Sequence, residues 1–277
     1  MGINKIKYLG RKFFGVRNLS TTPTYDPDAQ AYFNVNAAIT SAADKNAINT
    51  FYLGLKTDGI YTKLKAMYLP IWGSAATCKW NLINPLDTNA AFRCTYATGM
   101  TFSSNGMKGN GTSAYANTFL SSDQMSLNSL HLSYYSQQNL SNAGATEIGS
   151  LKSSPNSYSN LIIRQDINTA NMRLNSGGVT TNITNTNAIG FYCCTRRSVT
   201  DTELYKNGIS IQALSTNSFA VSNIPFFINA YNFSVIAGYS TKESSFVSIG
   251  SGLTATEVLN LSTRINTLMT YFGINKY

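Results

Sequence analysis

The sequence is poor in the side chains from which most metal and cofactor sites are built. Its 277 residues include one histidine, four cysteines and twelve acidic residues. The cysteines lack CxxC spacing and no Asp-rich loop follows the EF-hand pattern, so neither a zinc finger nor a calcium loop is indicated. The segment GMKGNGTS (residues 106–113) is rich in glycine but lacks the Gly-Lys-Ser/Thr ending of a phosphate loop. We therefore expect no required metal and no cofactor.

Charge and long apolar runs are scarce as well. Charged residues make up 12% of the chain, about half of the usual share. The uncharged stretches are interrupted by Asn, Ser and Gly, so none approaches the roughly 20 apolar residues that a spanning helix needs. No apolar core follows the basic N-terminus, which argues against a secretory signal. We expect a chain that does not span a membrane and whose β-rich surface is polar rather than ionic.

The four cysteines are Cys78, Cys94, Cys193 and Cys194. The adjacent pair cannot easily bridge to itself in ordinary backbone geometry. We interpret all four as reduced thiols in or near the core, in preference to a disulfide framework. A protein that folds in a reducing cytoplasm fits this interpretation best.

The net charge of +9 is concentrated at the N-terminus, where five cations precede the first acidic residue, Asp26. We expect residues 1–24 to form a basic arm that is either a solubilising tail or a segment that orders when it docks on a partner. Phe13 and Phe14 favour docking. The cations could also give weak, salt-sensitive nucleic-acid binding, although an acidic protein surface explains the same charges. The candidate anchoring residues are Lys5, Lys7, Arg11, Lys12, Phe13, Phe14 and Arg17.

Helical patterns frame the chain on both sides of its central part. Asp26 and Pro27 form an N-cap followed by proline at the first helical position, and apolar spacings of three and four predict a second helix over residues 41–56. A third short helix is expected over residues 60–69, closed by Pro70. Near the C-terminus, Thr254 and Glu257 match a capping box that opens a last helix.

Between these helices the chain consists of short strand-like segments separated by Asn, Gly and Ser turns. The clearest hairpin is ELYKNGISIQ, whose Asn207 and Gly208 both tolerate positive φ. This spacing is typical of an antiparallel sandwich or barrel. The expected strands cover residues 79–82, 101–102, 130–135, 147–150, 161–164, 190–195, 203–206, 209–214, 226–230 and 243–249.

The order of several segments carries a resemblance to a known family. The stretches FSSNGMKGNGTSAYANT, LHLSYYS, RRSVTDTELYKNGISIQ, FFINAYN and SSFVSIGSGLTATEVLNLSTRINTLMTYFG follow one another as in concanavalin-like, LamG-type jelly-roll sandwiches. The front half, with YDPDAQAYF, INTFYLGLKTDGIYTKLKAMYLPIWG and NLINPLDTNAAFR, resembles a version of this fold found among structural proteins of tailed bacteriophages. The resemblance covers about residues 25–275.

This resemblance implies a mainly β fold, an antiparallel jelly-roll β-sandwich with a small N-terminal helical section and a C-terminal helix. The expected division is a basic anchoring arm over residues 1–24, a helical section packed on the sandwich over 25–72, and the sandwich with its C-terminal helix over 73–277. Aromatic and amide side chains on such a sandwich are suitable for stacking on and hydrogen-bonding to sugars, although the sequence alone assigns no sugar site.

The same sequence argues against catalysis. A glycoside hydrolase generally needs two facing carboxylates, and the candidates Glu147 and Glu243 do not alternate on one strand. His131 lies in the alternating segment LHLSYY, and no GxSxG elbow marks a nucleophile, so a pair with Cys94 or Cys193 is disfavoured. We expect a protein that is not an enzyme.

The function implied is that of a non-catalytic virion structural protein, a capsid- or tail-attached fibre or decoration protein that exposes its jelly-roll domain for adhesion. Its expected partners are other virion proteins, bound through the N-terminal arm, and host-surface glycans, with no membrane and no specific nucleic acid. A homo-oligomer is expected, dimer or trimer, because multivalency increases avidity. The alternatives are a carbohydrate-binding receptor-recognition module and a glycan-cleaving enzyme. The protein would be made in the host cytoplasm and reside in the virion.

Overall fold

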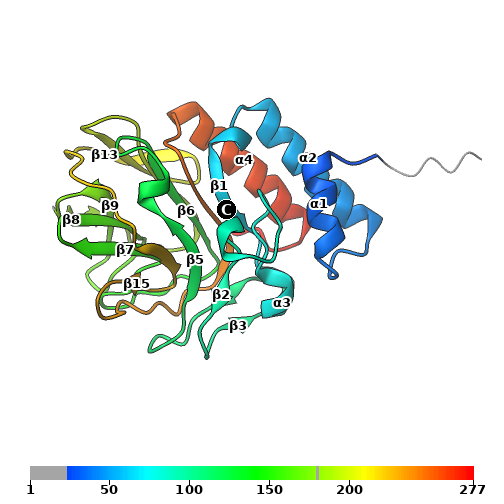
Figure 1. The fold of residues 1–277 in the computed structure, drawn as a ribbon, viewed down its shortest axis with the longest axis horizontal. Coiled ribbons are helices and arrows are strands. Elements are labelled where there is room, and N and C mark those ends of the chain that lie inside the picture. Colours follow the sequence, from blue (N-terminus) through cyan, green and yellow to red (C-terminus); the bar gives the residue numbers. More distant parts are fainter. Residues whose placement is uncertain (1–23, 179–180) are drawn as a thin grey trace, which may run out of the picture.

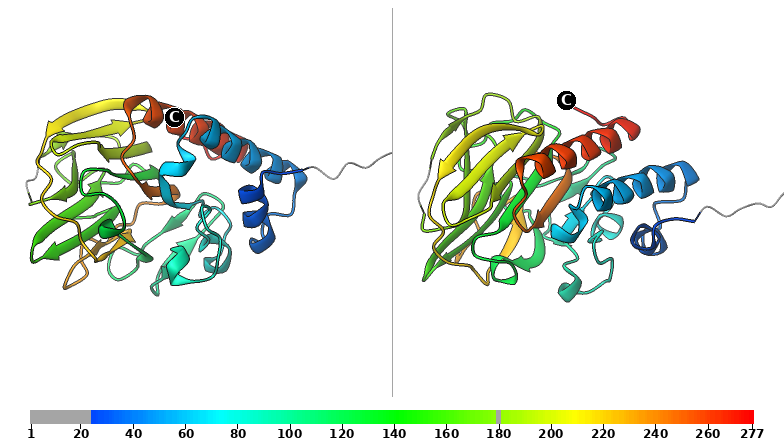
Figure 2. Two further views of the ribbon diagram at one scale, coloured as in Figure 1. Left: turned by 45° about the horizontal axis from the view of Figure 1, so that its top comes forward. Right: turned by 90° about the horizontal axis from the view of Figure 1, so that it is seen from above.

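The computed structural model describes residues 24–178 and 181–277. The expected basic arm, including all seven candidate anchoring residues from Lys5 to Arg17, lies outside the described residues, apart from Thr24. The described chain forms two antiparallel β-sheets in face-to-face contact, with helices on one side of the sandwich (Figures 1 and 2). The fold class expected from the sequence, a mainly β antiparallel sandwich with a C-terminal helix, is confirmed.

The first sheet has eight described strands. In spatial order they are β13 (Ile209–Ser215), β12 (Asp201–Lys206), β11 (Gly190–Arg196), β6 (Leu130–Ser136), β16 (Ser244–Gly250), β4 (Met107–Lys108) and β3 (Thr101–Phe102), with β1 (Leu64–Tyr68) paired to β16. The hairpin between β12 and β13 turns at Asn207 and Gly208, whose φ angles are 53° and 80°. The predicted two-residue turn is therefore confirmed.

The second sheet also has eight described strands. Their order is β10 (Ile183–Thr184), β9 (Thr169–Ser176), β8 (Asn156–Ile162), β7 (Ile148–Ser153), β14 (Pro225–Ile228), β5 (Ala116–Ser121) and β2 (Thr95–Tyr96), with β15 (Tyr231–Asn232) paired to β7. The pairing of β15 with β7 is parallel. The sequence did not predict β5 and β9; only β9 alternates apolar inward residues with polar outward ones, whereas β5 has Thr118 inward and Phe119 outward.

Helices form a third layer against the outer face of the first sheet. The longer ones are α1 (Pro27–Val35), α2 (Ala42–Thr57) and α4 (Ala255–Tyr271). In the described chain, four short helical segments lie next to or between the strands: η1 (Tyr61–Lys63), α3 (Ala75–Cys78), η2 (Asn89–Ala91) and η3 (Ser122–Gln124). The predicted caps form, because Asp26 accepts from the backbone N–H of Asp28, and Thr254 and Glu257 make a reciprocal capping box. Of the described residues, none belong to a helix both long and apolar enough to cross a membrane.

Two hydrophobic clusters lie on the two faces of the first sheet. Cys194 on β11 belongs to the cluster between the sheets, whereas Cys193 belongs to the cluster beneath the helices. Successive side chains of a strand point to opposite faces, so these adjacent thiols lie in different cores. All four cysteines are buried and unbridged, as expected from the sequence.

Two local predictions are wrong. Residues 60–69 form η1 and then strand β1 instead of a third helix, and Lys79 is the C-cap of α3 instead of the start of a strand. Strand β1 is buried on both faces, since Leu64 and Met67 contact the helical cluster while Ala66 and Tyr68 contact the inter-sheet cluster. A short apolar run of this kind fits a buried helix and a buried strand equally well. The section over residues 25–72 thus contributes a strand to the sandwich.

Candidate functional site

One row of paired residues crosses the outward face of the second sheet. It runs from Asn117 on β5 through Phe227, Gly149 and Asn160 to Arg173 on β9. Their strand neighbours on the opposite side are core residues of the inter-sheet cluster: Ala116, Ile228, Ile148, Leu161 and Met172. Because side chains alternate along a strand, the row faces away from the core, on the side of the sandwich opposite the helices.

Three tyrosines flank this row. Tyr115 stacks on Phe227, with ring centroids 4.2 Å apart and planes 9° from parallel. Tyr231 lies against the backbone of Gly149, where a β-carbon would come within 2.2 Å of the tyrosine Cδ2. The ring centroid of Tyr158 is 4.6 Å from the guanidinium carbon of Arg173, within cation–π range. We call Tyr115, Phe227, Gly149, Tyr231, Asn160, Tyr158 and Arg173 the tyrosine face.

The polar groups of the tyrosine face are only partly satisfied. Arg173 Nε donates to Asn160 Oδ1 at 2.7 Å. Asn160 is fully buried, yet its Nδ2 has no hydrogen-bond partner among the described residues, and the same holds for the buried hydroxyl of Tyr231. Burial raises the pKa of the Tyr231 phenol above its usual value. A buried donor without a partner costs roughly 1–3 kcal/mol.

The two carboxylates considered for catalysis occupy unrelated environments. Glu147 Oε1 is 3.0 Å from Lys242 Nζ, and both side chains are completely buried. Its other oxygen accepts the backbone N–H of Ile163 at 2.7 Å. Glu243 is half-buried and accepts from the Ser103 hydroxyl at 2.8 Å. Glu147 is thus bound by internal donors and closed to solvent. A general acid, by contrast, must be able to reach the glycosidic oxygen of a bound substrate.

His131 is a core residue of β6. Its Nδ1 lies 2.6 Å from the Ser251 carbonyl oxygen, which can only accept, so this nitrogen carries the proton. Its Nε2 lies 3.1 Å from the Ser248 hydroxyl. Burial lowers the pKa of His131 to about 4, which leaves a neutral imidazole at physiological pH. In the part of the chain that the structure describes, no group of three or more His, Cys, Asp or Glu side chains could hold a metal.

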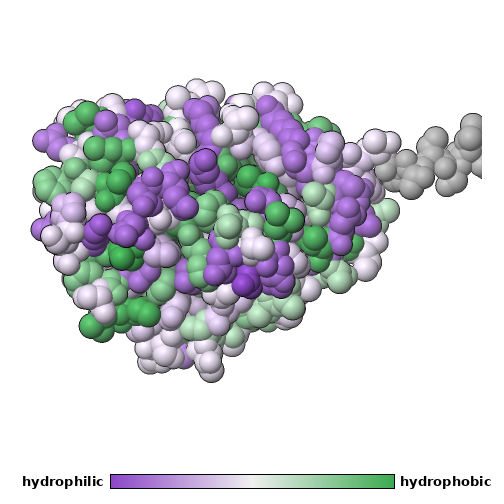
Figure 3. All heavy atoms as spheres, in the orientation of Figure 1, coloured by the Kyte–Doolittle hydropathy of each residue, from purple (hydrophilic) through white to green (hydrophobic). Residues whose placement is uncertain are grey.

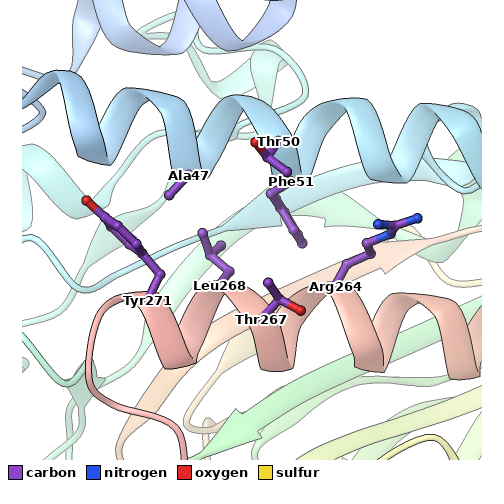
Figure 4. Close-up of a pocket in the computed structure, with 7 residues that line it drawn as sticks. All are labelled: Ala47, Thr50, Phe51, Arg264, Thr267, Leu268 and Tyr271. Carbon is purple, nitrogen blue, oxygen red and sulfur yellow. The ribbon is translucent and has the colours of Figure 1, made fainter.

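A separate hollow lies between α2 and α4 (Figure 4). It is a pocket of about 220 Å³. Phe51 and Leu268 point toward one another from the two helices, with Arg264 and Tyr271 at its two ends. Arg264 Nε is 2.9 Å from Asp58 and the Tyr271 hydroxyl donates to Asp44 at 2.9 Å. The polar groups of this pocket are therefore already engaged, and what remains is a small apolar contact surface.

Hydropathy does not single out another large site on the face seen in Figure 3. Hydrophobic and hydrophilic residues are interspersed there, with hydrophilic side chains gathered along the helices at the upper right. The exposed large hydrophobic residues are scattered over several elements, and they include Leu53, Leu86, Ile167, Ile209 and Val235. Scattered exposure of this kind is ordinary for the surface of a folded domain.

No known family profile and no curated protein sequence matches this chain. Several solved structures match its shape. Domain 4 of an extracellular arabinanase from Geobacillus stearothermophilus, in complex with arabinotriose, aligns at 13% identity with a TM-score of 0.50, covering 72% of this chain and 98% of the domain. The fold is that of a jelly-roll-like β-sandwich.

Two larger proteins contain a similar sandwich. A Trypanosoma rangeli sialidase in complex with a difluoro sugar acid aligns at 11% identity with a TM-score of 0.52, covering 84% of this chain and 40% of the sialidase. A structure of botulinum neurotoxin type C, a toxin that needs two ganglioside molecules to enter cells, aligns at 12% identity with a TM-score of 0.50, covering 75% of this chain and 52% of that one. This chain therefore spans about half or less of these two.

The sequence did not identify the tyrosine face. It indicated that Tyr and Asn were suitable in type for sugar contacts. The row, however, joins the consecutive strands β7, β8 and β9 to β5 and β14, which lie elsewhere in the sequence. A local signal for this face lies in β9 (TANMRLNS), where Arg173 is the one charged residue in an alternating pattern of polar and apolar side chains.

Proposed function

We propose that this chain is a non-catalytic adhesion module that binds carbohydrate on the tyrosine face. The observation that carries this proposal is the clustering of Tyr158, Tyr231 and Arg173 around Asn160, on the outward face of a sheet. Aromatic rings offer flat apolar surfaces to the CH faces of a sugar ring. Amide and guanidinium donors between the rings match the hydroxyl oxygens of a sugar. The terminal nitrogens of Arg173, which are not buried, are the first donors that such a ligand would meet.

The shape comparisons support this choice among sandwich functions. The arabinanase domain was solved with arabinotriose, the sialidase with a sugar acid, and the neurotoxin is described with gangliosides. At 11–13% identity these proteins share the fold with this chain. Among them the arabinanase domain is matched over 98% of its length and was solved with a saccharide, which supports a carbohydrate ligand for such a sandwich.

The environment of Glu147 supports the non-catalytic part of the proposal. Its contact with Lys242 and the backbone of Ile163 leaves neither oxygen free for a substrate. The assay is polysaccharide breakdown by the unaltered chain and by Glu147→Gln and Glu243→Gln variants. Breakdown by the unaltered chain that either substitution abolishes would show a glycan-cleaving enzyme instead.

We also propose that the module is carried on a virus particle, as a fibre or decoration protein attached to capsid or tail and assembled as a dimer or trimer. The basic, aromatic arm over residues 1–24 and the sequence resemblance to phage structural proteins support this proposal. Deletion of residues 1–24 should abolish incorporation into particles while leaving glycan binding intact. Incorporation without the arm would remove the arm as the anchor.

Glycan binding is tested with an array probed by the full chain. We expect hits for the unaltered protein, and at least a tenfold loss of affinity, about 1.4 kcal/mol, for Tyr158→Ala and Tyr231→Ala. The matched control is Tyr271→Ala, which removes an exposed tyrosine from α4, far from the sheet face. An array without hits would contradict the carbohydrate role, and equal losses in all three variants would move the site elsewhere.

A further inference from the structure

Three arginines of the described chain, Arg164, Arg173 and Arg196, have no carboxylate partner. Arg164 donates instead to the side chains of Asn139 and Asn168, and Arg196 donates to backbone carbonyls. Arg197 contacts Asp201 and Glu203 at 2.7 Å, and Arg264 contacts Asp58 at 2.9 Å. Arg173 instead lies against two tyrosine rings, 4.6 Å from the centroid of Tyr158 and 5.9 Å from that of Tyr231.

The contacts of Arg173 hold its guanidinium in place and leave one edge open. Nε is used by Asn160 Oδ1 at 2.7 Å. The terminal nitrogens Nη1 and Nη2 have no hydrogen-bond partner in residues 24–178 and 181–277, and they are not among the buried orphaned atoms. The free edge is therefore the end of the fork, where two parallel N–H groups point the same way.

An open guanidinium fork is selective for one class of ligand. Its two parallel donors match the two oxygens of a carboxylate, and such charge-assisted bidentate pairs are stronger than neutral hydrogen bonds. Sugar hydroxyls do not supply this paired, charged acceptor. The flanking rings of Tyr158 and Tyr231 restrict the orientation of the guanidinium, so little rotamer freedom is lost when a ligand binds.

We propose that Arg173 binds the carboxylate of an acidic saccharide, a uronic or sialic type of sugar, while a neighbouring sugar ring rests on Tyr231 or Tyr158. This inference rests on the proposed carbohydrate role and specifies its ligand class. Asn160 Oδ1 accepts from Arg173 Nε at 2.7 Å and so positions the fork from beneath. Neutral sugars bind more weakly because they offer no charged acceptor, so the terminal N–H groups of Arg173 stay hydrogen-bonded to water.

The test uses two polymers with one backbone, polygalacturonate and its fully methyl-esterified form, titrated against the full chain by calorimetry. We expect the unaltered protein to bind the acid form roughly 10- to 100-fold more tightly than the ester, the range for a hydrogen bond to a charged group. Arg173→Gln should lose this preference, and Arg173→Lys should retain only part of it, since ammonium lacks the fork.

A control separates site binding from the general attraction between a basic protein and an anionic polymer. Lys65→Gln removes the same unit of charge from an exposed position on β1, in the other sheet, and should keep the full preference. Thermal unfolding of each variant confirms that it folds.

The outcomes distinguish the two proposals. Equal affinity for acid and ester, or a preference that survives Arg173→Gln, overturns the assignment of Arg173 while leaving carbohydrate binding in place. A preference lost equally in Lys65→Gln also overturns it, as a nonspecific charge effect. An absence of binding to both polymers and to every glycan of the array overturns the carbohydrate role and this inference together.

Discussion

Tyr231 and Gly149 are in direct contact across the β15–β7 pair, and the tyrosine ring occupies the space that any side chain at position 149 would need. A β-carbon there would lie 2.2 Å from Tyr231 Cδ2 and 2.8 Å from the Thr146 methyl group. The ring can rest on the sheet only because residue 149 has no side chain. Gly149 is therefore a structural requirement of the tyrosine face, although it has no side chain that could contact a ligand.

Substitution Gly149→Ala should displace Tyr231 and weaken glycan binding by about tenfold. Overpacking also costs roughly 1–3 kcal/mol of stability, so affinity is compared with the unfolding free energy measured in urea. The matched control is Gly177→Ala, whose new methyl group would meet only Phe219 at 3.5 Å, an ordinary contact. Unchanged affinity in the Gly149 variant would show that Tyr231 does not contact the ligand.

The buried ion pair makes a strong prediction about stability. Substitution Lys242→Met leaves Glu147 buried without its cation and should lower the free energy of unfolding by about 3–5 kcal/mol. The double variant with Glu147→Leu should lose less than the two single variants together. A surface comparison is Lys79→Gln, which breaks the contact with the exposed Asp87 and should cost less than about 1 kcal/mol. Equal costs for Lys242→Met and Lys79→Gln would contradict the account of this pair.

His131 predicts a fall in stability with falling pH. Its pKa is about 4 in the folded chain and 6.5 in the unfolded chain, because burial disfavours the cation. Below pH 6.5 the unfolded state therefore binds a proton that the folded state does not. The resulting loss grows to about 3 kcal/mol as the pH approaches 4. The charges of Lys63 and Glu257 also act on His131. They form an ion pair at 2.7 Å and shift the pKa of His131 in opposite directions.

The measurement for His131 is urea unfolding between pH 7 and 4 for the unaltered chain and His131→Gln. The variant should be less stable at pH 7 but should lose less stability on acidification. Parallel pH profiles would show that His131 does not carry this dependence.

The cysteines predict a simple labelling result. Burial raises the pKa of the Cys194 thiol to about 12 and holds that of Cys193 well above its usual value. Buried, protonated thiols are inert, so the native chain at pH 8 should not react with Ellman's reagent, and denaturant should release four reactive thiols. Rapid native labelling, or fewer than four thiols on unfolding, would contradict this arrangement.

Much of the fold could be predicted from local chemistry. Short sequence segments specify the helix caps at Asp26 and Thr254 and the turn at Asn207–Gly208. Each of these features forms as predicted. Strand β1 could not be separated from a helix because both of its faces are buried. Strand β9 was missed since its outward Asn171 and Arg173 look like loop residues until the sheet places them.

The tyrosine face depends on the register in which its strands pair, and the sequence alone does not reveal that register. Arg173, Asn160 and Gly149 become neighbours only through the pairing of β9, β8 and β7, and Tyr231 joins them through a parallel strand. The sequence argues against the catalytic candidates through residue types, their spacing and missing motifs, without their partners in the fold. Whether Glu147 faced a cleft or a lysine depended on residue 242, which is 95 positions away.

The most direct test of the central claim is a map of amide chemical-shift changes when the isotope-labelled full chain is titrated with a glycan from the array. The account predicts that the largest changes lie on β7, β8, β9 and β15, around Gly149, Asn160, Arg173 and Tyr231. Changes confined to the α2–α4 pocket around Phe51 and Leu268, with the second sheet unaffected, would contradict it.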